Sequence, residues 1–571
     1  MKTCFASAVL SAGSLLFSTA LALSAQTEKP ADQSAFPVTI QVDATQTLGE
    51  LKPIWRFFGA DEPNYATMKD GRKLIGELGG LKPKSVYFRA HNLLNTGDGT
   101  PALKWGSTNT YTEDAKGNPI YDWTGTDRIF DTYLARGVRP YLQIGFMPEA
   151  LSIHPEPYQH EWRPGLKYDD ISTGWAFPPK DYAKWGELAY QWTKHCVERY
   201  GRAEVEQWYF EVWNEPNGAA YWRATPEDFQ KLHDYAVAGV RRALSTARVG
   251  GPDVAGHGGK FMESFMQHIV HGKNYATGET GTPVDFISFH AKGSPVFVDG
   301  HVRMGIANQL RTVDTGFAMI AAVPELKSKP IVIGESDPEG CAACQSPQNG
   351  YRNGTMYSSY TAAVFMRNQE LAQKHGVNLE AALTWAFEFE DQPYFAGFRA
   401  LATNGIDLPV LNVFRMFSKM GGQRLAAHSS AEIPLATMLK EGVRGQPDVA
   451  AFASLDGRRL SIMVWHYHDD DLRGPDAAVE LTTTGLGKGD SALLTHYRID
   501  ATHSNSYAEW KRLGSPIAPN DAQYARLEKA GELALLAPTE KVSLENGTAT
   551  LKFTLPRQGV SLLVLELPAA N

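Results

Sequence analysis

The sequence predicts an α/β protein that consists of a (β/α)8 TIM barrel and a C-terminal all-β accessory domain, a β-sandwich. Two observations predict this architecture. Between about residues 54 and 425, eight short apolar runs alternate with amphipathic stretches, as expected for parallel strands that are buried on both faces and separated by helices. From about residue 426 onward, short alternating runs with turn residues between them take over, which is typical of antiparallel strands.

We assign the barrel to residues 51–425 and the β domain to residues 426–571. The amphipathic stretch DRIFDTYLARG (127–137) has apolar residues at helical spacing and a closing glycine, and KDYAKWGELAYQWTKHCVERYG (180–201) has the same features. The eight runs that we assign to the barrel strands are IWRFFGA (54–60), SVYFRAH (85–91), RPYLQIGF (139–146), EQWYFEVWNE (206–215), RVGGPDV (248–254), VDFISFHA (284–291), PIVIGES (330–336) and AALTWAF (381–387).

The first 25 residues have the pattern of a signal peptide. Lys2 gives a short positive region, an apolar stretch follows, and small residues end it near Ala22 and Ala25. This predicts a secreted or periplasmic protein that has no membrane attachment after cleavage, while an uncleaved anchor is the alternative. Residues 26–50 contain a polar linker and the alternating run FPVTIQVDA (36–44). This run predicts a strand without a helix partner, which is free to join the β domain.

Composition and charge exclude some functions. The net charge is −8 and no block of Lys and Arg is present, which argues against a nucleic-acid partner. Aromatic residues make up 11% of the chain, which suits sugar binding but also suits an ordinary core. The sequence HYHDDD (466–471) contains metal-binding residue types, but it follows a strand far from the barrel, so we interpret it as a solvated turn. No metal and no cofactor are expected.

Four cysteines are present. Cys4 lies in the predicted signal peptide, and Cys196 lies in a helix-like run, which predicts a buried thiol. Cys341 and Cys344 form the sequence CAAC. Because a second CxxC that would complete a zinc site is absent from the sequence, and because the protein is expected to be exported, we favour a local disulfide over two free thiols.

Two glutamates end strongly apolar runs, and barrel active sites lie at the carboxyl ends of the strands. Glu215 ends the fourth run and Glu335 ends the seventh. Two carboxyl groups that face each other across the barrel mouth are what a retaining glycosidase needs, one as general acid and one as nucleophile. Pro216 stops the fourth strand, and the neighbouring Trp213 would raise the pKa of a proton-donating Glu215 by lowering the local dielectric. On its own, Asn-Glu-Pro is equally well read as a capped loop turn.

Several longer stretches together resemble glycoside hydrolase family 39, the family of β-xylosidases and α-L-iduronidases. The resemblance covers about residues 50–425, with looser similarity in the β domain. It implies a (β/α)8 retaining glycosidase. The stretches that carry it are WNEPN (213–217), the glutamate of PIVIGES (330–336), VYFRAH (86–91), VDFISFH (284–290), YDWTGTDRIFDTYLARGVRPYLQIGFMP (121–148) and LTWAFEFEDQPYFAGFRALATNGIDLPVLNVFRMFSKMGG (383–422).

The resemblance implies Glu215 as the general acid/base and Glu335 as the nucleophile. It implies Asn214 as the partner of the sugar 2-hydroxyl and Trp385 as the platform under the sugar. The full set of substrate-binding residues that it implies is Asn214, Arg89, His91, His290, Trp385, Glu390 and Asp391. Glu390 and Asp391 align with an acidic pair that holds distal ring hydroxyls, although the segment here is shorter and its second member is Asp.

Other readings of these residues remain open. Arg89 could be a structural barrel arginine paired with a glutamate, and His91 and His290 could be core histidines. After the nucleophile the chain continues Ser-Asp-Pro instead of the commoner Trp, which marks a subgroup. In this subgroup the CAAC sequence is expected to fix the loop just past Glu335.

The expected activity is that of a retaining exo-glycosidase, a β-D-xylosidase that releases xylose from the non-reducing end of xylo-oligosaccharides by double displacement. Another glycone on the same scaffold is the first alternative, with α-L-arabinosidase or α-L-iduronidase activity. An iduronidase needs a cation for the C5 carboxylate of its substrate, and Lys292 is a candidate. A catalytically inactive carbohydrate-binding protein is the second alternative. The sequence leaves open whether the protein forms a homo-oligomer.

Overall fold

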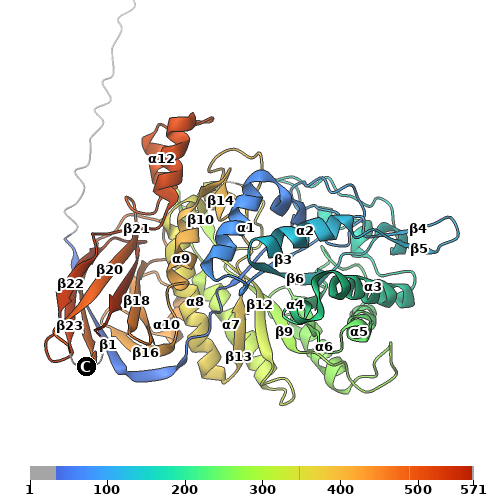
Figure 1. Cartoon of the computed structure of the whole chain (residues 1–571), viewed down its shortest axis with the longest axis horizontal. Coiled ribbons are helices and arrows are strands. Elements are labelled where there is room, and N and C mark those ends of the chain that lie inside the picture. The colour runs from blue at the N-terminus through green and yellow to red at the C-terminus, as the bar shows by residue number, and fades with distance from the viewer. Residues whose placement is uncertain (1–33, 346, 488, 569–571) are drawn as a thin grey trace, which may run out of the picture. The chain divides into compact units, whose positions relative to one another are not determined.

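A parallel eight-stranded barrel forms the first part of the fold, in the strand order β13-β12-β9-β8-β7-β6-β3-β2 (Figure 1). The computed structural model describes residues 34–345, 347–487 and 489–568; the predicted signal peptide (1–25) lies outside them. The barrel strands are β2 (Phe57–Ala60), β3 (Val86–Ala90), β6 (Val138–Ile144), β7 (Tyr209–Val212), β8 (Arg248–Val254), β9 (Phe286–Lys292), β12 (Pro330–Asp337) and β13 (Asn378–Ala382).

The first and last strands close the barrel. Thr384, just beyond β13, forms a parallel bridge with Phe58 of β2, and its backbone N–H donates to the Phe57 carbonyl oxygen over 3.0 Å. Each of the eight predicted runs contributes one strand. The eighth strand begins three positions before its predicted run and ends at Ala382, so that Trp385 lies beyond it.

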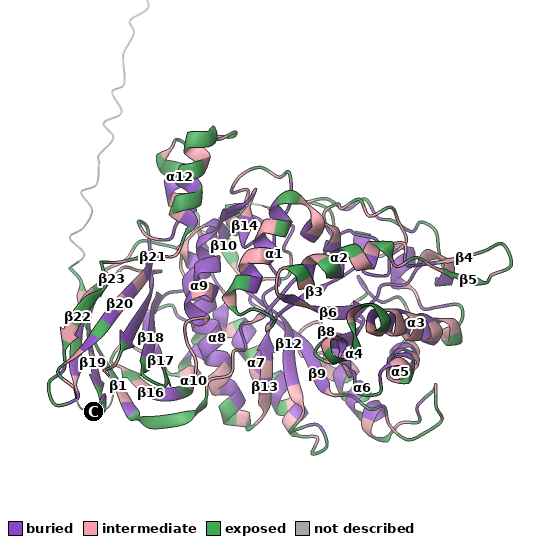
Figure 2. Cartoon of the chain, in the orientation of Figure 1, coloured by how far each residue is buried: buried purple, intermediate pink, exposed green. Residues whose placement is uncertain are grey.

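Helices surround the barrel, and Figure 2 shows that several, such as α1, α2 and α3, bury one side and expose the other. This follows from their sequences, in which apolar residues recur at helical spacing. The helices of this part are α1 (Lys69–Leu81), α2 (Thr124–Ala135), α3 (Tyr182–Tyr200), α4 (Arg202–Val205), α5 (Pro226–Ala243), α6 (Gly259–His271), α7 (Ile306–Ala321), α8 (Thr355–His375) and α9 (Pro409–Phe417).

The long loops of the barrel contain short elements of their own. These are the strand pairs β4 (Tyr111–Glu113) with β5 (Pro119–Tyr121), β10 (Val296–Val298) with β11 (His301–Arg303), and β14 (Ala402–Thr403) with β15 (Ile406–Asp407), and the 3-10 helices η1 (Pro63–Thr67), η2 (Glu149–Leu151), η3 (Tyr168–Ile171), η4 (Gly174–Ala176) and η5 (Pro347–Asn353).

The second part is a mostly antiparallel sheet of ten strands. The N-terminal strand β1 (Phe36–Glu50) pairs with β16 in antiparallel and with β19 in parallel orientation, so the expected N-terminal strand joins this sheet. Apolar side chains from strands near both ends of the strand order pack together in one core. The remaining strands are β16 (Gln423–Ser429), β17 (Asp448–Asp456), β18 (Arg459–Tyr467), β19 (Ala477–Thr484), β20 (Ser491–Ile499), β21 (Ala534–Leu535), β22 (Glu540–Ser543), β23 (Ala549–Leu555) and β24 (Val560–Glu566).

Three short helices also belong to this second part, namely α10 (Leu435–Glu441), α11 (Ser506–Arg512) and α12 (Asp521–Gly531). The side chain of Asn520 caps α12, and Gln523 bonds back to it to complete a capping box. Within the described residues, no helix combines the length and the apolar character that crossing a membrane requires.

Helix α8 joins the barrel to the β domain. The buried guanidinium of Arg367 lies 2.8 Å from Glu432 and 3.1 Å from Asp448, both in the second part of the chain. Ser359 donates a hydrogen bond of 2.7 Å to Gln558. Buried ion pairs of this kind fix the position of two packed surfaces because breaking one leaves an unpaired charge.

Candidate active site

The carboxyl ends of four barrel strands bring most of the predicted site residues together. Arg89 and His91 come from β3, Asn214 and Glu215 from the end of β7, His290 from β9 and Glu335 from β12. In the register between β9 and β12, His290 lies opposite Glu335 and Lys292 lies opposite Asp337. The cluster therefore follows from the strand order and register of the barrel.

The separation of the two glutamates is limited by a histidine between them. His290 Nδ1 lies 2.8 Å from Glu215 Oε1 and 3.8 Å from Glu335 Oε2. These two oxygens are therefore at most about 6.6 Å apart, a limit that accommodates the roughly 5–5.5 Å between the carboxyl groups of retaining enzymes. The Glu215 side chain is 19% exposed and that of Glu335 is 6% exposed, so Glu215 is the more accessible of the two.

Basic side chains surround Glu335. Lys292 Nζ lies 2.6 Å from Oε2, while Arg89 Nη1 and His91 Nε2 each lie 3.7 Å from Oε1. Burial by itself would raise the pKa of this carboxyl, but the nearby His290, Lys292, His91 and Arg89 outweigh it and hold the pKa of Glu335 well below its usual range. Glu335 is therefore ionised at neutral pH, as a nucleophile must be.

His290 connects Glu215 to a second carboxylate. Its Nδ1 faces Glu215 and its Nε2 lies 2.8 Å from Asp253 Oδ2. Burial disfavours the charged imidazole, but Asp253 and Glu335 outweigh burial and raise the pKa of His290 to about 10. A positively charged His290 donates from both ring nitrogens, which fixes the orientation of the Glu215 carboxyl group.

Arg89 is fully buried and forms the centre of a charge network. Its Nε donates to Glu211 over 2.5 Å, its Nη2 donates to Asn214 Oδ1 over 3.0 Å, and it also pairs with Asp253. Burial raises the pKa of Glu211 to about 7 despite the Arg89 charge, whereas Arg89 and His290 lower the pKa of Asp253 below its usual range against the effect of burial. Arg89 thus pairs with a glutamate, as expected for a structural barrel arginine, and it also contacts the site residue Asn214.

Sequence reasoning missed Glu211 and Asp253. Asp253 sits where the pairing register of β8 shifts, and Gly334 sits at the corresponding shift in β12. A Cβ atom at Gly334 would overlap the Asp253 carboxylate, so glycine is required there for the close approach. One signal in the sequence could have identified Asp253: it is a polar residue, in the sequence Gly-Pro-Asp, near the end of the fifth apolar run.

The backbone after β7 is bent to place Glu215. Trp213 and Glu215 have φ angles of 74° and 44°, in the left-handed region that non-glycine residues avoid. The Glu215 N–H donates to the Asp253 carbonyl over 2.9 Å, and the buried Trp213 ring packs on Phe146 and Trp222 with centroid distances of 5.2 Å each. The aromatic residues around Asn-Glu-Pro therefore hold a strained turn in place, as is common at functional sites.

The base of the site is aromatic. The Trp385 ring lies 4.2 Å from the His91 ring and 5.0 Å from the Arg89 guanidinium carbon, measured to the ring centroids. His91 Nδ1 in turn lies 2.8 Å from Asp61, which also pairs with Lys104 over 2.7 Å. These contacts fix His91 and Trp385 next to the two glutamates.

The side-chain amide nitrogen of Asn214 has no hydrogen-bond partner among the described residues. Asn214 itself is fully buried. A buried N–H without an acceptor is costly unless a ligand or water supplies one. Asn214 Nδ2 is therefore available to a substrate hydroxyl.

A family model decides which family the chain belongs to. The model of the family described as glycosyl hydrolases family 39 matches residues 38–542. The chain belongs to this family. It is therefore a glycosidase, and the fold expected from the sequence, a TIM barrel with a β accessory domain, is confirmed.

Members of family 39 with two activities resemble the chain. A β-xylosidase from Geobacillus stearothermophilus is 26% identical over 541 residues, which cover 90% of this chain and 93% of that enzyme. An α-L-iduronidase from Mus musculus is 24% identical over 541 residues, which cover 88% of this chain and 77% of that protein. The crystal structure of a monomeric β-xylosidase from Caulobacter crescentus has a TM-score of 0.72 at 20% identity, covering 93% of this chain and 100% of that one, and shows the shared fold.

In this family 39 chain, Lys292 lies between two carboxylates. Its Nζ lies 2.6 Å from Glu335 Oε2 and 2.5 Å from Asp337 Oδ2. Asp337 is fully buried and also lies 3.6 Å from Arg399 Nη2. The site thus contains a lysine ammonium directly beside the predicted nucleophile.

Glu390 and Asp391 occupy a different position in the structure. Glu390 Oε1 accepts hydrogen bonds of 2.8 Å from the backbone N–H groups of Asp70 and Gly71, in the first turn of α1. A carboxylate there satisfies free N–H groups of the helix end. Asp391 is exposed. The contact of these two residues with a sugar stays a prediction.

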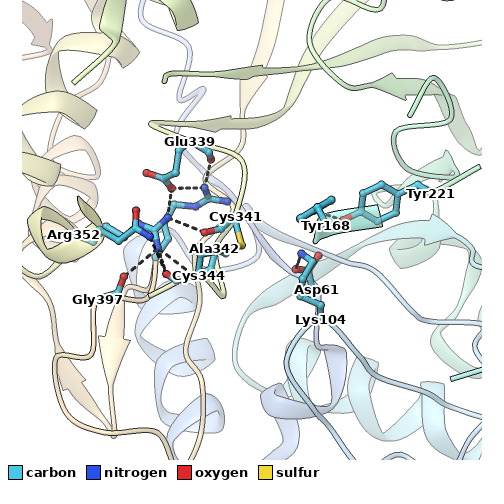
Figure 3. The surroundings of a disulfide bond; sticks show 12 residues. Asp61, Lys104, Tyr168, Tyr221, Glu339, Cys341, Ala342, Cys344, Arg352 and Gly397 are labelled. Carbon is cyan, nitrogen blue, oxygen red and sulfur yellow. Dashed lines mark hydrogen bonds and ion pairs between the residues drawn. A yellow bond between two sulfur atoms is a disulfide. The ribbon is translucent and has the colours of Figure 1, made fainter. Parts of the chain in front are cut away.

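Cys341 and Cys344 form a disulfide bond at the mouth of the site. Together with Tyr168 and Glu215 they line a cavity of about 430 Å3 (Figure 3 shows the surroundings of the disulfide). Among the described residues, no group of three or more His, Cys, Asp or Glu side chains is arranged to hold a metal ion.

Proposed function

We propose that this family 39 glycosidase is a retaining exo-glycosidase in which Glu335 is the nucleophile and Glu215 is the general acid/base. The observation that carries this proposal is the pair of glutamates that both lie near Nδ1 of His290, with an upper limit of about 6.6 Å between the two oxygens that face this nitrogen. The charged surroundings of Glu335 and the greater exposure of Glu215 support the assignment of the two roles.

In this mechanism the Glu335 carboxylate attacks the anomeric carbon while Glu215 gives its proton to the leaving oxygen. The glycosidic C–O bond breaks and a covalent ester between the sugar and Glu335 forms. Glu215, now a carboxylate, takes a proton from a water molecule that attacks the same carbon and releases the sugar with retained configuration. Asn214 Nδ2 donates to the 2-hydroxyl, and Trp385 supports the sugar face.

For the glycone we propose β-D-xylose, cut from the non-reducing end of xylo-oligosaccharides. The similarity to β-xylosidases over about nine-tenths of the chain supports this choice. We also propose that the protein is exported, because its Cys341–Cys344 disulfide suits an oxidising compartment.

A second glycone is favoured by one specific observation, the position of Lys292. An α-L-iduronide has the same arrangement at C1 to C4 as a β-D-xyloside and carries an additional carboxylate at C5. An ammonium group 2.6 Å from the nucleophile could pair with such a carboxylate. Lys292 is already shared between Glu335 and Asp337, so it is also explained by a role in keeping Glu335 ionised.

The test of the mechanism is proton NMR of the reaction with aryl β-D-xyloside and aryl α-L-iduronide, recording which anomer is released first. We expect the anomer with retained configuration; the inverted anomer would refute the mechanism. We expect Glu335→Ala to abolish turnover on every substrate. Glu215→Ala should keep more activity on substrates with good leaving groups and recover with azide. Equal loss on all substrates without azide rescue would contradict the assigned roles.

A further inference from the structure

We propose that the cavity in front of Glu215 is the binding site for the leaving group, and that its wall, the Cys341–Cys344 loop, selects a neutral sugar there. The proposal rests on the function proposed above and adds the class of leaving group to it. The cavity has a volume of about 430 Å3, within the range of roughly 300–1,000 Å3 that small-molecule sites have. Its lining includes the side chains of Tyr168, Glu215, Ser294, Pro295, Gln348 and Asn349.

The position of the cavity beside Glu215 agrees with the chemistry of a general acid. A general acid protonates the oxygen of the leaving group, so the leaving group must lie on the side of the acid. Glu215 lines this cavity, and Glu335 is not among its lining residues. The space therefore lies on the leaving-group side of the bond that is cut.

The wall of the cavity is held rigidly. Arg352 is fully buried, and its guanidinium donates to the carbonyl oxygens of Cys341 over 2.8 Å, Cys344 over 2.8 Å and Gly397 over 3.0 Å. Figure 3 shows the Arg352 side chain reaching these carbonyl groups, while Tyr168 and Tyr221 lie to the right of the loop in this view. The disulfide and the arginine thus fix one short loop from two sides. A loop with so many fixed contacts can present a preformed surface to a ligand.

The charges in the wall are already paired. Glu339 Oε1 lies 2.7 Å from Arg352 Nη2 and 2.6 Å from Arg399 Nη1. Among the described residues that line the cavity, Arg352 is the only Lys or Arg, and its charge is paired with Glu339. An anionic leaving group would therefore find no free cation among these lining residues.

The remaining lining groups suit a neutral sugar ring. Ser294, Gln348 and Asn349 offer hydroxyl and amide groups that can bond to sugar hydroxyls. The Tyr168 ring, Pro295 and the disulfide offer apolar surface for a sugar face. The hydroxyl of Tyr168 lies 2.6 Å from that of Tyr221, which holds its ring in position.

The experiment compares two substrates with the same glycone. β-Xylosyl fluoride has a leaving group too small to fill the cavity, and xylobiose places a neutral sugar in it. In the variant C341S/C344S we expect kcat/KM for xylobiose to fall about tenfold or more, with the fluoride changed by less than about twofold. Equal loss on both substrates, or no loss on either, would overturn the proposal. A faster reaction with a uronic acid leaving group than with xylobiose would overturn the neutral class.

Three further measurements keep the result clear. Gln348→Ala changes an exposed lining side chain without touching the disulfide, and it should show the same selective loss. Cys196→Ala removes the buried thiol of α3 and should leave the ratio of the two rates unchanged. Calorimetric titration of xylobiose into Glu335→Ala, with and without the disulfide, measures binding without turnover. Equal affinity for xylobiose with and without the disulfide would refute the leaving-group site. If the wild-type protein hydrolysed no glycosyl fluoride, that result would instead refute the proposed function.

Discussion

Replacing Lys292 with methionine tests how the site keeps its nucleophile ionised. The ammonium is the nearest positive group to Glu335, at 2.6 Å, compared with 3.7 Å for Arg89 and His91. At an effective dielectric constant of about 20, a pair of charges at this distance attracts by about 6 kcal/mol before the cost of burial is subtracted. Methionine keeps the length of the side chain and removes the charge.

The size of the effect can be read from the pH dependence of the first chemical step. Opposite charges close to a carboxylate usually lower its pKa by about 1–3, so we expect the acid limb of the rate to move up by about 1–3 pH units in Lys292→Met. The direction follows because Glu335 attacks only as a carboxylate, and losing a cation favours its protonated form. The assay is the rate of inactivation by a 2-fluoro glycoside, which forms the ester with Glu335 and stops there.

The control and the refuting result are both accessible. Lys374 is half exposed and pairs with Asp314 over 2.6 Å, so Lys374→Met removes a paired lysine far from the site chemistry and should leave the pH profile unchanged. An unchanged acid limb in Lys292→Met would refute the reasoning that this ammonium keeps Glu335 ionised. A loss confined to iduronides, without a change in the acid limb, would instead assign Lys292 to the substrate carboxylate.

Two further predictions concern stability. Arg89→Met removes the guanidinium that pairs with the buried carboxyl groups of Glu211 and Asp253, and urea denaturation should show a loss of about 3–5 kcal/mol, against less than about 1 kcal/mol for the exposed Arg199→Met; a loss no larger than that of the control would contradict the charge network. Burial raises the pKa of Glu388 to about 8 in the folded protein. Between about pH 4.5 and pH 8 the folded protein therefore keeps a proton on Glu388 that the unfolded chain has released. The free energy of unfolding consequently decreases as the pH rises through this range. Glu388→Gln should therefore raise the melting temperature at pH 8 and have little effect below pH 4.5, and an equal effect at both values would refute the buried acid.

The sequence predicted the barrel and its two glutamates because these depend on local patterns. A strand that is buried on both faces needs a continuous apolar run, and Glu215 and Glu335 stand out where such runs end. The eighth strand begins and ends earlier than its predicted run. AALTWAF is almost entirely apolar, so the sequence pattern does not show where the strand ends. Its end is decided by barrel closure, through the bridge from Thr384 to Phe58.

Features that depend on distant partners could not be predicted. The solvated turn expected at HYHDDD (466–471) was wrong, because His466 and Asp469 are buried and Asp470 bonds over 2.6 Å to Arg303 of β11 in the barrel. The contacts that Asp469 and Asp470 make with Met304 and Arg303 leave no mark in the local sequence. In the same way, the hydrogen bonds of Glu390 to the first turn of α1 join residues more than 300 positions apart.

The pairing of β1 has a consequence for the biosynthesis of the chain. A ribosome produces this strand first, but its partners begin only at Gln423 and Ala477, so about three-quarters of the polypeptide must emerge before β1 can pair. The barrel segments can fold during this interval, since domains tend to fold in order of synthesis. A nascent or truncated chain that stops after the barrel would carry β1 as a free edge of 15 residues, in which buried side chains alternate over residues 36–44. Such an edge recruits strands from other molecules, so truncation should lead to aggregation of the product before it weakens the barrel.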